Sequence, residues 1–201
     1  MNPGGDGLKL KPLVVVHRGA ALFAVLVVLL GLGACGRKEN RVSSEDIQRA
    51  QSALRPFKEE LQTALREGLR GGPANAIWVC RVKAPEIAAR LSTAGVTMGR
   101  TSHRLRNPAN AAEPWMEPLL GEFLEKTGDR TYRAVRLSDG AIGYVEPIYV
   151  RPVCLSCHGK NISSAVAERL KASYPQDHGK DFEAGELRGL FWVKLSAAAE
   201  K

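Results

Sequence analysis

A short segment near the C-terminus carries the residues best suited to chemistry. Two thiols, Cys154 and Cys157, are separated by two residues, and His158 follows directly. Thiols at this spacing can form thioethers with the two vinyl groups of one haem, and the next residue can place an imidazole under the iron. The pattern therefore predicts one covalently attached haem c, with His158 as an axial ligand.

Two other readings of the cysteine pair are less consistent with the rest of the chain. A redox disulfide is expected within a thioredoxin-like βαβ unit, and none is visible around Cys154. A zinc site would need a second pair of ligands at short spacing, which the sequence does not contain. With haem bound, we expect the second ring nitrogen of His158 to donate a hydrogen bond to a carbonyl or carboxylate.

The N-terminus predicts export, and c-type haem is attached outside the cytoplasm. Basic residues precede a short apolar run at 19–32, which stops at Cys35 in a Leu-Gly-Ala-Cys sequence that resembles the bacterial lipobox. We interpret residues 1–34 as a lipoprotein signal peptide, Cys35 as the lipidated first residue and 35–42 as a tether. The domain would then lie on the periplasmic side of a bacterial membrane. An uncleaved N-terminal membrane anchor is the alternative.

Composition excludes some classes of function. The formal net charge is +8 and 44% of the residues are hydrophobic, so a packed core is expected rather than disorder. Lysine and arginine are spread along the chain among acidic residues, with no basic block interleaved with aromatic residues. We therefore expect no binding to nucleic acid.

The elements that must position the cysteine pair can be read from periodicity. Apolar residues recur every three or four positions from Ile47 to Leu65, after a Ser43–Asp46 helix start, which predicts a long helix. The other predicted elements are a helical stretch at 74–91 with a restart at Pro85, a strand at 96–102, a loop at 107–110, a helix at 118–126, a hairpin of 131–137 with 141–150, and a last strand at 187–195. This order favours an α+β fold with an antiparallel sheet.

Cys80 remains after the other cysteines are assigned, since Cys35 is assigned to lipid and the close pair to haem. It can be a small buried apolar residue, as free cysteines often are. It can also be the sixth, axial ligand of the iron, because a thiolate donates electron density and lowers the reduction potential. Other candidates for this position are Met98, Met116, His103 and His178.

Several sequence blocks resemble the c-type haem-binding, PAS-like sensor domain family first recognised in a cyanobacterial protein. These blocks are Ala76–Cys80 with Ala84–Ala88, Gly99–Ser102, Arg106–Asn110, Cys154–Gly159, and Tyr174–Asp177 with Gly185–Gly189. The resemblance covers residues 43–195 and leaves 196–201 as a tail. It implies a PAS-like antiparallel sheet with long N-terminal helices, and histidine and cysteine axial ligands that match His158 and Cys80.

The same resemblance suggests Trp78, Arg100 and Asn107 as possible residues of the haem pocket. Departures occur at 178–180 and 190–193, which bear on how the haem edge is packed. Members of the family act alone or as the sensing module of signalling proteins. We therefore expect redox sensing through an unidentified redox or signalling protein, with membrane contact through the lipid on Cys35.

A single-haem electron carrier in the periplasm is the alternative function. A peroxidase-like enzyme is a weaker one, because it needs an open iron site with a distal acid–base pair.

Overall fold

The long helix predicted at the N-terminus is present. The computed structural model describes residues 41–93, 95–126 and 128–197, and its first helix, α2, is Ser44–Arg70. The hydroxyl of Ser43 accepts a hydrogen bond from the backbone N–H of Asp46 at 3.0 Å, as expected of a helix N-cap. The predicted signal peptide at 1–34, the tether up to residue 40 and the tail residues 198–201 lie outside the described residues.

The second helical stretch is divided differently from the prediction. It consists of α3 (Pro73–Trp78), a π-helical turn η1 (Val79–Lys83) and α4 (Ala84–Leu91). The predicted restart at Pro85 corresponds to the beginning of α4, but the irregular backbone itself lies before it, in η1. Single π turns within helices are often found at functional sites.

The sheet has four antiparallel strands in the order β1-β4-β3-β2. The strands are β1 (Val96–Thr101), β2 (Arg133–Arg136), β3 (Ile142–Tyr149) and β4 (Leu187–Leu195). Strands β2 and β3 form the predicted hairpin, and the late strand β4 pairs between β3 and β1. The chain thus brings its last strand into the middle of the sheet.

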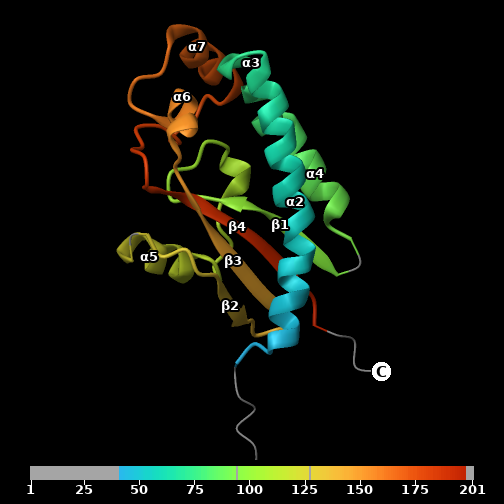
Figure 1. Cartoon of the computed structure of the whole chain (residues 1–201). Helices are drawn as coiled ribbons and strands as arrows, with labels where there is room; N and C mark the ends of the chain where they lie inside the picture. The colour runs from blue at the N-terminus through green and yellow to red at the C-terminus, as the bar shows by residue number, and fades with distance from the viewer. Residues whose placement is uncertain (1–40, 94, 127, 198–201) are drawn as a thin grey trace, which may run out of the picture. The chain divides into compact units, whose positions relative to one another are not determined.

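Helices cover both faces of this sheet (Figure 1). Helix α2 packs over one face in a core that also includes residues of α4, β1, β3 and β4. Helix α5 (Glu117–Glu125) packs on the other face through Leu119, Leu120 and Phe123, against Val145 and Leu190. The α+β class predicted from the sequence is therefore confirmed.

A separate cluster of short elements carries the cysteine pair. It contains η3 (Pro152–Cys154), α6 (Leu155–His158) and α7 (Ser164–Ser173), which gather with α3 near one end of α2 (Figure 1). Helix α7 is not among the predicted elements, because Val166 and Leu170 are its only buried residues and too few to mark a helical face. The predicted loop at 107–110 contains a short 3₁₀ turn, η2 (Pro108–Asn110).

Within 41–93, 95–126 and 128–197, no helix combines the length and the apolar character needed to cross a membrane.

Candidate functional site

The two thiols of the close pair are free and lie on consecutive helical turns. Cys154 ends η3 and Cys157 lies in α6, and both side chains are half-buried. Cys157 packs against the small core that joins α3 to α7, and its sulfur lies 3.9 Å from the Pro73 carbonyl oxygen. Burial is the main cause that raises the pKa of the Cys157 thiol. Cys157 is thus held beside an apolar wall.

His158 is fixed by both its ring and its backbone. The ring Nδ1 lies 2.6 Å from the carbonyl oxygen of Gly179, and the His158 carbonyl accepts a hydrogen bond from Phe182 N at 2.9 Å. A carbonyl oxygen can only accept, so Nδ1 carries the proton and Nε2 keeps its lone pair. This is the carbonyl hydrogen bond expected of an iron-ligating histidine.

Electrostatics also keep this imidazole neutral. Burial, followed by the charges of Arg188 and Arg106, holds the pKa of His158 well below its ordinary value of 6.5. The backbone hydrogen bond to Gly179 opposes this shift without reversing it. A neutral imidazole with a free Nε2 is the form that binds a metal.

The loop Asp177–Glu183 wraps around the cysteine-histidine segment. The N–H of Asp181 donates to the Gly159 carbonyl at 3.3 Å, and the N–H of His178 donates to the Leu105 carbonyl at 2.8 Å. Asp181 has a φ of 62°, in the left-handed region that is uncommon for a residue other than glycine. The loop is therefore tied to the segment it covers at the cost of local strain.

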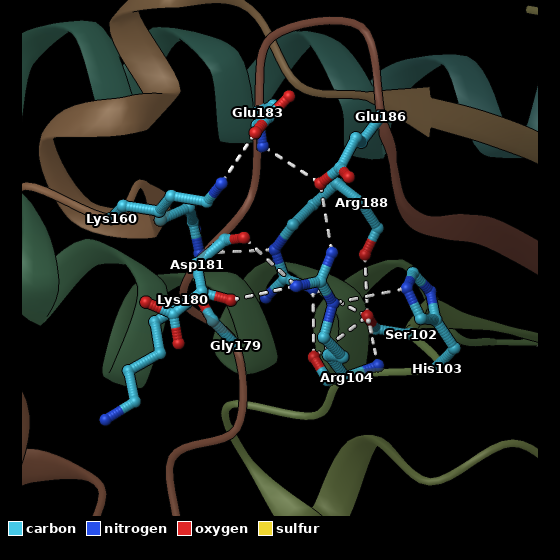
Figure 2. Close-up of polar contacts among 11 residues, drawn as sticks. Ser102, His103, Arg104, Lys160, Gly179, Lys180, Asp181, Glu183, Glu186 and Arg188 are labelled. Atoms are coloured by element: carbon cyan, nitrogen blue, oxygen red, sulfur yellow. Dashed lines mark hydrogen bonds and ion pairs between the residues drawn. The ribbon is translucent and has the colours of Figure 1, made fainter.

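Arg104 holds this loop from the outside, as Figure 2 shows. Its guanidinium donates to the carbonyl oxygens of Lys180 and Asp181, each at 3.2 Å, and to the Glu186 carboxylate at 3.0 Å. The same group stacks over the ring of the buried Phe182, 3.6 Å from its centre. The His158 and Phe182 rings are nearly perpendicular, with their centres 6.3 Å apart.

Arg106 joins three segments beneath His158. Its guanidinium forms a buried ion pair with Asp177 at 3.1 Å and donates to the carbonyl oxygens of Cys157 at 2.6 Å and Gly179 at 2.9 Å. Gly179 has no room for a side chain, because an added Cβ would lie 3.0 Å from both Arg106 Cβ and Arg188 Nη2. The position of the Gly179 carbonyl is thus set by Arg106.

Arg188 is the second arginine that lies against His158. Its Nη1 donates to Ser102 Oγ at 2.7 Å and to the Arg104 carbonyl at 3.3 Å, and its Nε lies 3.3 Å from His158 Nδ1. Burial, followed by the nearby charges of Arg106 and Arg100, lowers the pKa of Arg188 to about 10. Because ordinary pH is well below this value, Arg188 remains a buried cation.

Cys80 lies on the π turn η1 and is half-buried. A negative charge on Cys80 would act to raise the pKa values of Cys157, Arg188 and Tyr174. For Tyr174, burial is the larger cause, and its pKa is raised to about 12. The Cys80 thiol is therefore within electrostatic range of the cysteine pair, although 77 residues separate it from Cys157 in the sequence. Ligation by Cys80 stays a prediction.

The residues predicted for the pocket have different surroundings. Arg100, on β1, is half-buried, and its positive charge helps to lower the pKa values of His158 and Arg188. Trp78 is 46% exposed, with Lys83 Nζ 5.1 Å from the centre of its ring. Asn107 caps η2, since its side chain accepts a hydrogen bond from Ala109 N at 3.1 Å. Cys35 lies outside the described residues.

The other candidate ligands have contacts of their own. Met98 and Met116 are buried, Met98 in the core beneath α2. His103 lies edge-on to Phe182 with ring centres 5.7 Å apart, and burial lowers its pKa. His178 is exposed, in the loop that covers the cysteine-histidine segment.

The roles of Arg106, Arg188 and the carbonyl of Gly179 were not predicted from the sequence. Their signal was present, since both arginines fall within blocks that carry the family resemblance, and Gly179 falls where the sequence departs from it. The sequence shows only that two of these residues are charged and that the third is a glycine. It does not show which partner each of them contacts.

Comparisons with known proteins agree with the resemblance. A sequence profile of the Tll0287-like family matches residues 37–196. Among solved structures, the crystal structure of the cyanobacterial heme-protein Tll0287 is similar, with a TM-score of 0.59 and 21% identity over 80% of this chain and 100% of that chain. The curated protein sequences gave no significant match. Because the profile spans most of the sequence, this chain belongs to the Tll0287-like family.

Proposed function

We propose that this protein binds one haem c through thioethers to Cys154 and Cys157, with His158 and Cys80 as axial ligands. The observation that carries the proposal is the ring of His158, whose Nδ1 bonds to Gly179 O at 2.6 Å and leaves Nε2 free beside two free thiols. The bound haem would supply a one-electron redox centre. The solved relative is itself named a heme-protein, which supports the proposal.

The chain provides what covalent haem needs on both sides of the site. The small core of α3 and α7 gives an apolar wall next to Cys157, and Arg100, whose charge reaches His158, supplies positive charge for the carboxylates of the haem. Cys80 would add a thiolate from the facing π turn.

We propose redox sensing and signalling through a protein partner as the role. The π turn that carries Cys80 begins at Val79, which is buried in the same core as α2. A change at Cys80 would therefore act directly on the long helix, which a partner can read. This link between a ligand and a 27-residue helix is more than electron transfer requires.

Electron transfer is the second candidate, and the exposed residues around the site favour it. Trp78, two residues before Cys80, is 46% exposed, and Val153, directly before Cys154, is 51% exposed. Exposed apolar residues beside a redox centre can form a contact for an electron-transfer partner. An enzyme is a weaker candidate, because a sixth ligand would close the iron to substrate.

Haem attachment is tested on the full-length protein expressed with a cytochrome c maturation system. We expect a haem-stained band that survives denaturation and is absent from the double variant Cys154→Ala, Cys157→Ala. The Met98→Leu variant is a control that should keep the band. Release of haem from the parent protein into acidified acetone would refute covalent attachment.

The choice between sensing and electron transfer is tested by an anaerobic redox titration followed by optical spectra, with and without carbon monoxide. A six-coordinate haem that stays closed to carbon monoxide in both redox states favours electron transfer. Binding of carbon monoxide after reduction shows a labile sixth ligand and favours sensing.

We also propose that the protein is held on the periplasmic side of a membrane by lipid on Cys35. The Leu-Gly-Ala-Cys sequence at that position supports this, and two or more acyl chains anchor a protein firmly. Mass spectrometry of the native protein should find no residues 1–34 and an acylated Cys35. An intact N-terminus would instead support the uncleaved anchor.

A further inference from the structure

Arg188 is a buried cation placed directly behind His158. Its Nε lies 3.3 Å from the ring Nδ1, and its Nη2 is close to the backbone of Gly179, where an added Cβ would lie 3.0 Å away. Its Nη1 donates to the hydroxyl of Ser102, the residue after β1, at 2.7 Å (Figure 2). The charge is therefore fixed in place beside the histidine.

The hydrogen bonds of Arg188 leave its charge without a carboxylate. They run to the hydroxyl of Ser102 and to the carbonyl of Arg104, both of which are neutral. In the part of the chain that the structure describes, no ion pair of Arg188 is found. The acidic groups nearby are bound by other arginines, Asp177 by Arg106 and Glu186 by Arg104.

Arg188 does not act on His158 through a hydrogen bond. Nδ1 already donates its proton to Gly179 O at 2.6 Å, so it cannot also accept one from Arg188 Nε. What remains is the electric field of a buried positive charge, which is screened much less than that of an exposed charge. Reduction adds one negative charge to the site, and a nearby fixed positive charge favours that state.

We propose that Arg188 raises the reduction potential of the site by holding a positive charge against the ligand His158, and so opposes the anionic thiolate of Cys80. The inference rests on the proposed function, since it requires haem on His158. Arg188 is thus a positioning residue, which does not bind the iron but acts on the site through its fixed positive charge. The potential would be set by a cation on one side of the site and an anion on the other.

The test compares reduction potentials of full-length, haem-loaded variants, with dithionite as the electron donor. Arg188→Gln should shift the potential to more negative values, while Arg188→Lys, which keeps the charge, should remain closer to the parent. Lys160→Gln is the matched control. It removes an exposed charge two residues from His158, paired with Glu183 at 2.6 Å, and should shift the potential much less because water screens it.

A second pair of variants keeps Arg188 and tests whether a new carboxylate beside it offsets its charge. Ser102→Asp places a carboxylate where Arg188 Nη1 now meets the Ser102 hydroxyl, and Ser102→Asn has the same size without the charge. The aspartate variant should have the more negative potential of the two. This pair decides the question by itself if Arg188→Gln loads no haem.

Potentials of Arg188→Gln equal to or above the parent, or equal potentials in the two Ser102 variants, would overturn the inference. These outcomes are distinct from failure of the proposed function. That failure is recognised by the absence of a haem-stained band in the parent protein.

Discussion

Two arginine clusters in this protein are built in opposite ways. Arg133, on β2, donates to Asp129 at 2.6 Å and to Glu122 at 3.0 Å, both within 11 residues of it in the sequence. Arg106, behind His158, donates to Asp177, Cys157 and Gly179, which are 51 to 73 residues away. The first cluster ties neighbouring segments together, whereas the second holds distant segments in one site.

The clusters also differ in charge balance. Arg133 has two carboxylates as partners, so its charge is neutralised locally. Around His158, the structure shows an ion pair for Arg106 in the described part of the chain and none for Arg100 or Arg188. This fold thus neutralises a cation where its role is structural and leaves positive charge in excess where an anionic ligand set is proposed.

The largest effect is expected at Cys80, the anion proposed for the site. Cys80→Ala should change the ferric haem from low-spin to high-spin or water-ligated, and the potential should rise because a thiolate donor is lost. Optical and electron paramagnetic resonance spectra measure the spin state. Gly121→Ala in α5, where an added Cβ meets nothing within 4 Å, is the control and should leave the spectra as they are. Spectra and potential unaffected by Cys80→Ala would leave Cys80 as a packing residue and direct the test to Met98, Met116, His103 or His178.

The next largest effect should be the stability loss in Arg106→Gln. Its partner Asp177 would become an unpaired buried carboxylate, and the carbonyl oxygens of Cys157 and Gly179 would each lose one donor. Removing one partner of a buried ion pair costs about 3 kcal/mol or more. Urea unfolding of the haem-loaded protein measures the loss of unfolding free energy. A loss no greater than that of Arg133→Gln would contradict the contrast between the two clusters.

Gly179→Ala should have a smaller effect, from crowding. The new methyl group would lie 3.0 Å from Arg106 Cβ and from Arg188 Nη2, and overpacking of this kind costs about 1–3 kcal/mol. Gly121→Ala in α5 is the matched control, because an added Cβ there meets nothing within 4 Å. Alanine is also the better helix former, so this control should be neutral or stabilising. Equal destabilisation by both changes would show that the site accommodates a methyl group at Gly179 without crowding.

The smallest effect is expected for Arg133→Gln, about 1 kcal/mol, because its ion pairs are partly exposed. Hydrogen bonds from Thr131 and then Arg133 hold the pKa of Asp129 below its ordinary value of 3.8. A carboxyl whose pKa is lowered in the folded state stabilises the protein above the unfolded pKa and loses this contribution as the pH falls. Stability of the parent should therefore drop between about pH 4 and pH 2, and less steeply in Arg133→Gln. Parallel pH curves would contradict this assignment.

Local and repetitive features were accessible from the sequence. The apolar face of α2, the hairpin of β2 and β3 and the strand β4 follow from periodicity and turn residues, which act between neighbours in the chain. The spacing of Cys154, Cys157 and His158 is likewise a local property, and it predicts the same chemistry whatever the fold. The cluster around Arg133 is local too, since its partners lie within 11 residues.

Only the tertiary structure decided what surrounds His158. The carbonyl of Gly179, the pair of Arg106 with Asp177 and the charge of Arg188 come from segments far apart in the sequence. No periodicity links such residues, because a backbone carbonyl has no side-chain signature and an arginine in a sequence is most often a surface charge. Their roles follow from the pairing of β4 between β1 and β3, which brings the end of β1 and the start of β4 next to the cysteine-histidine segment.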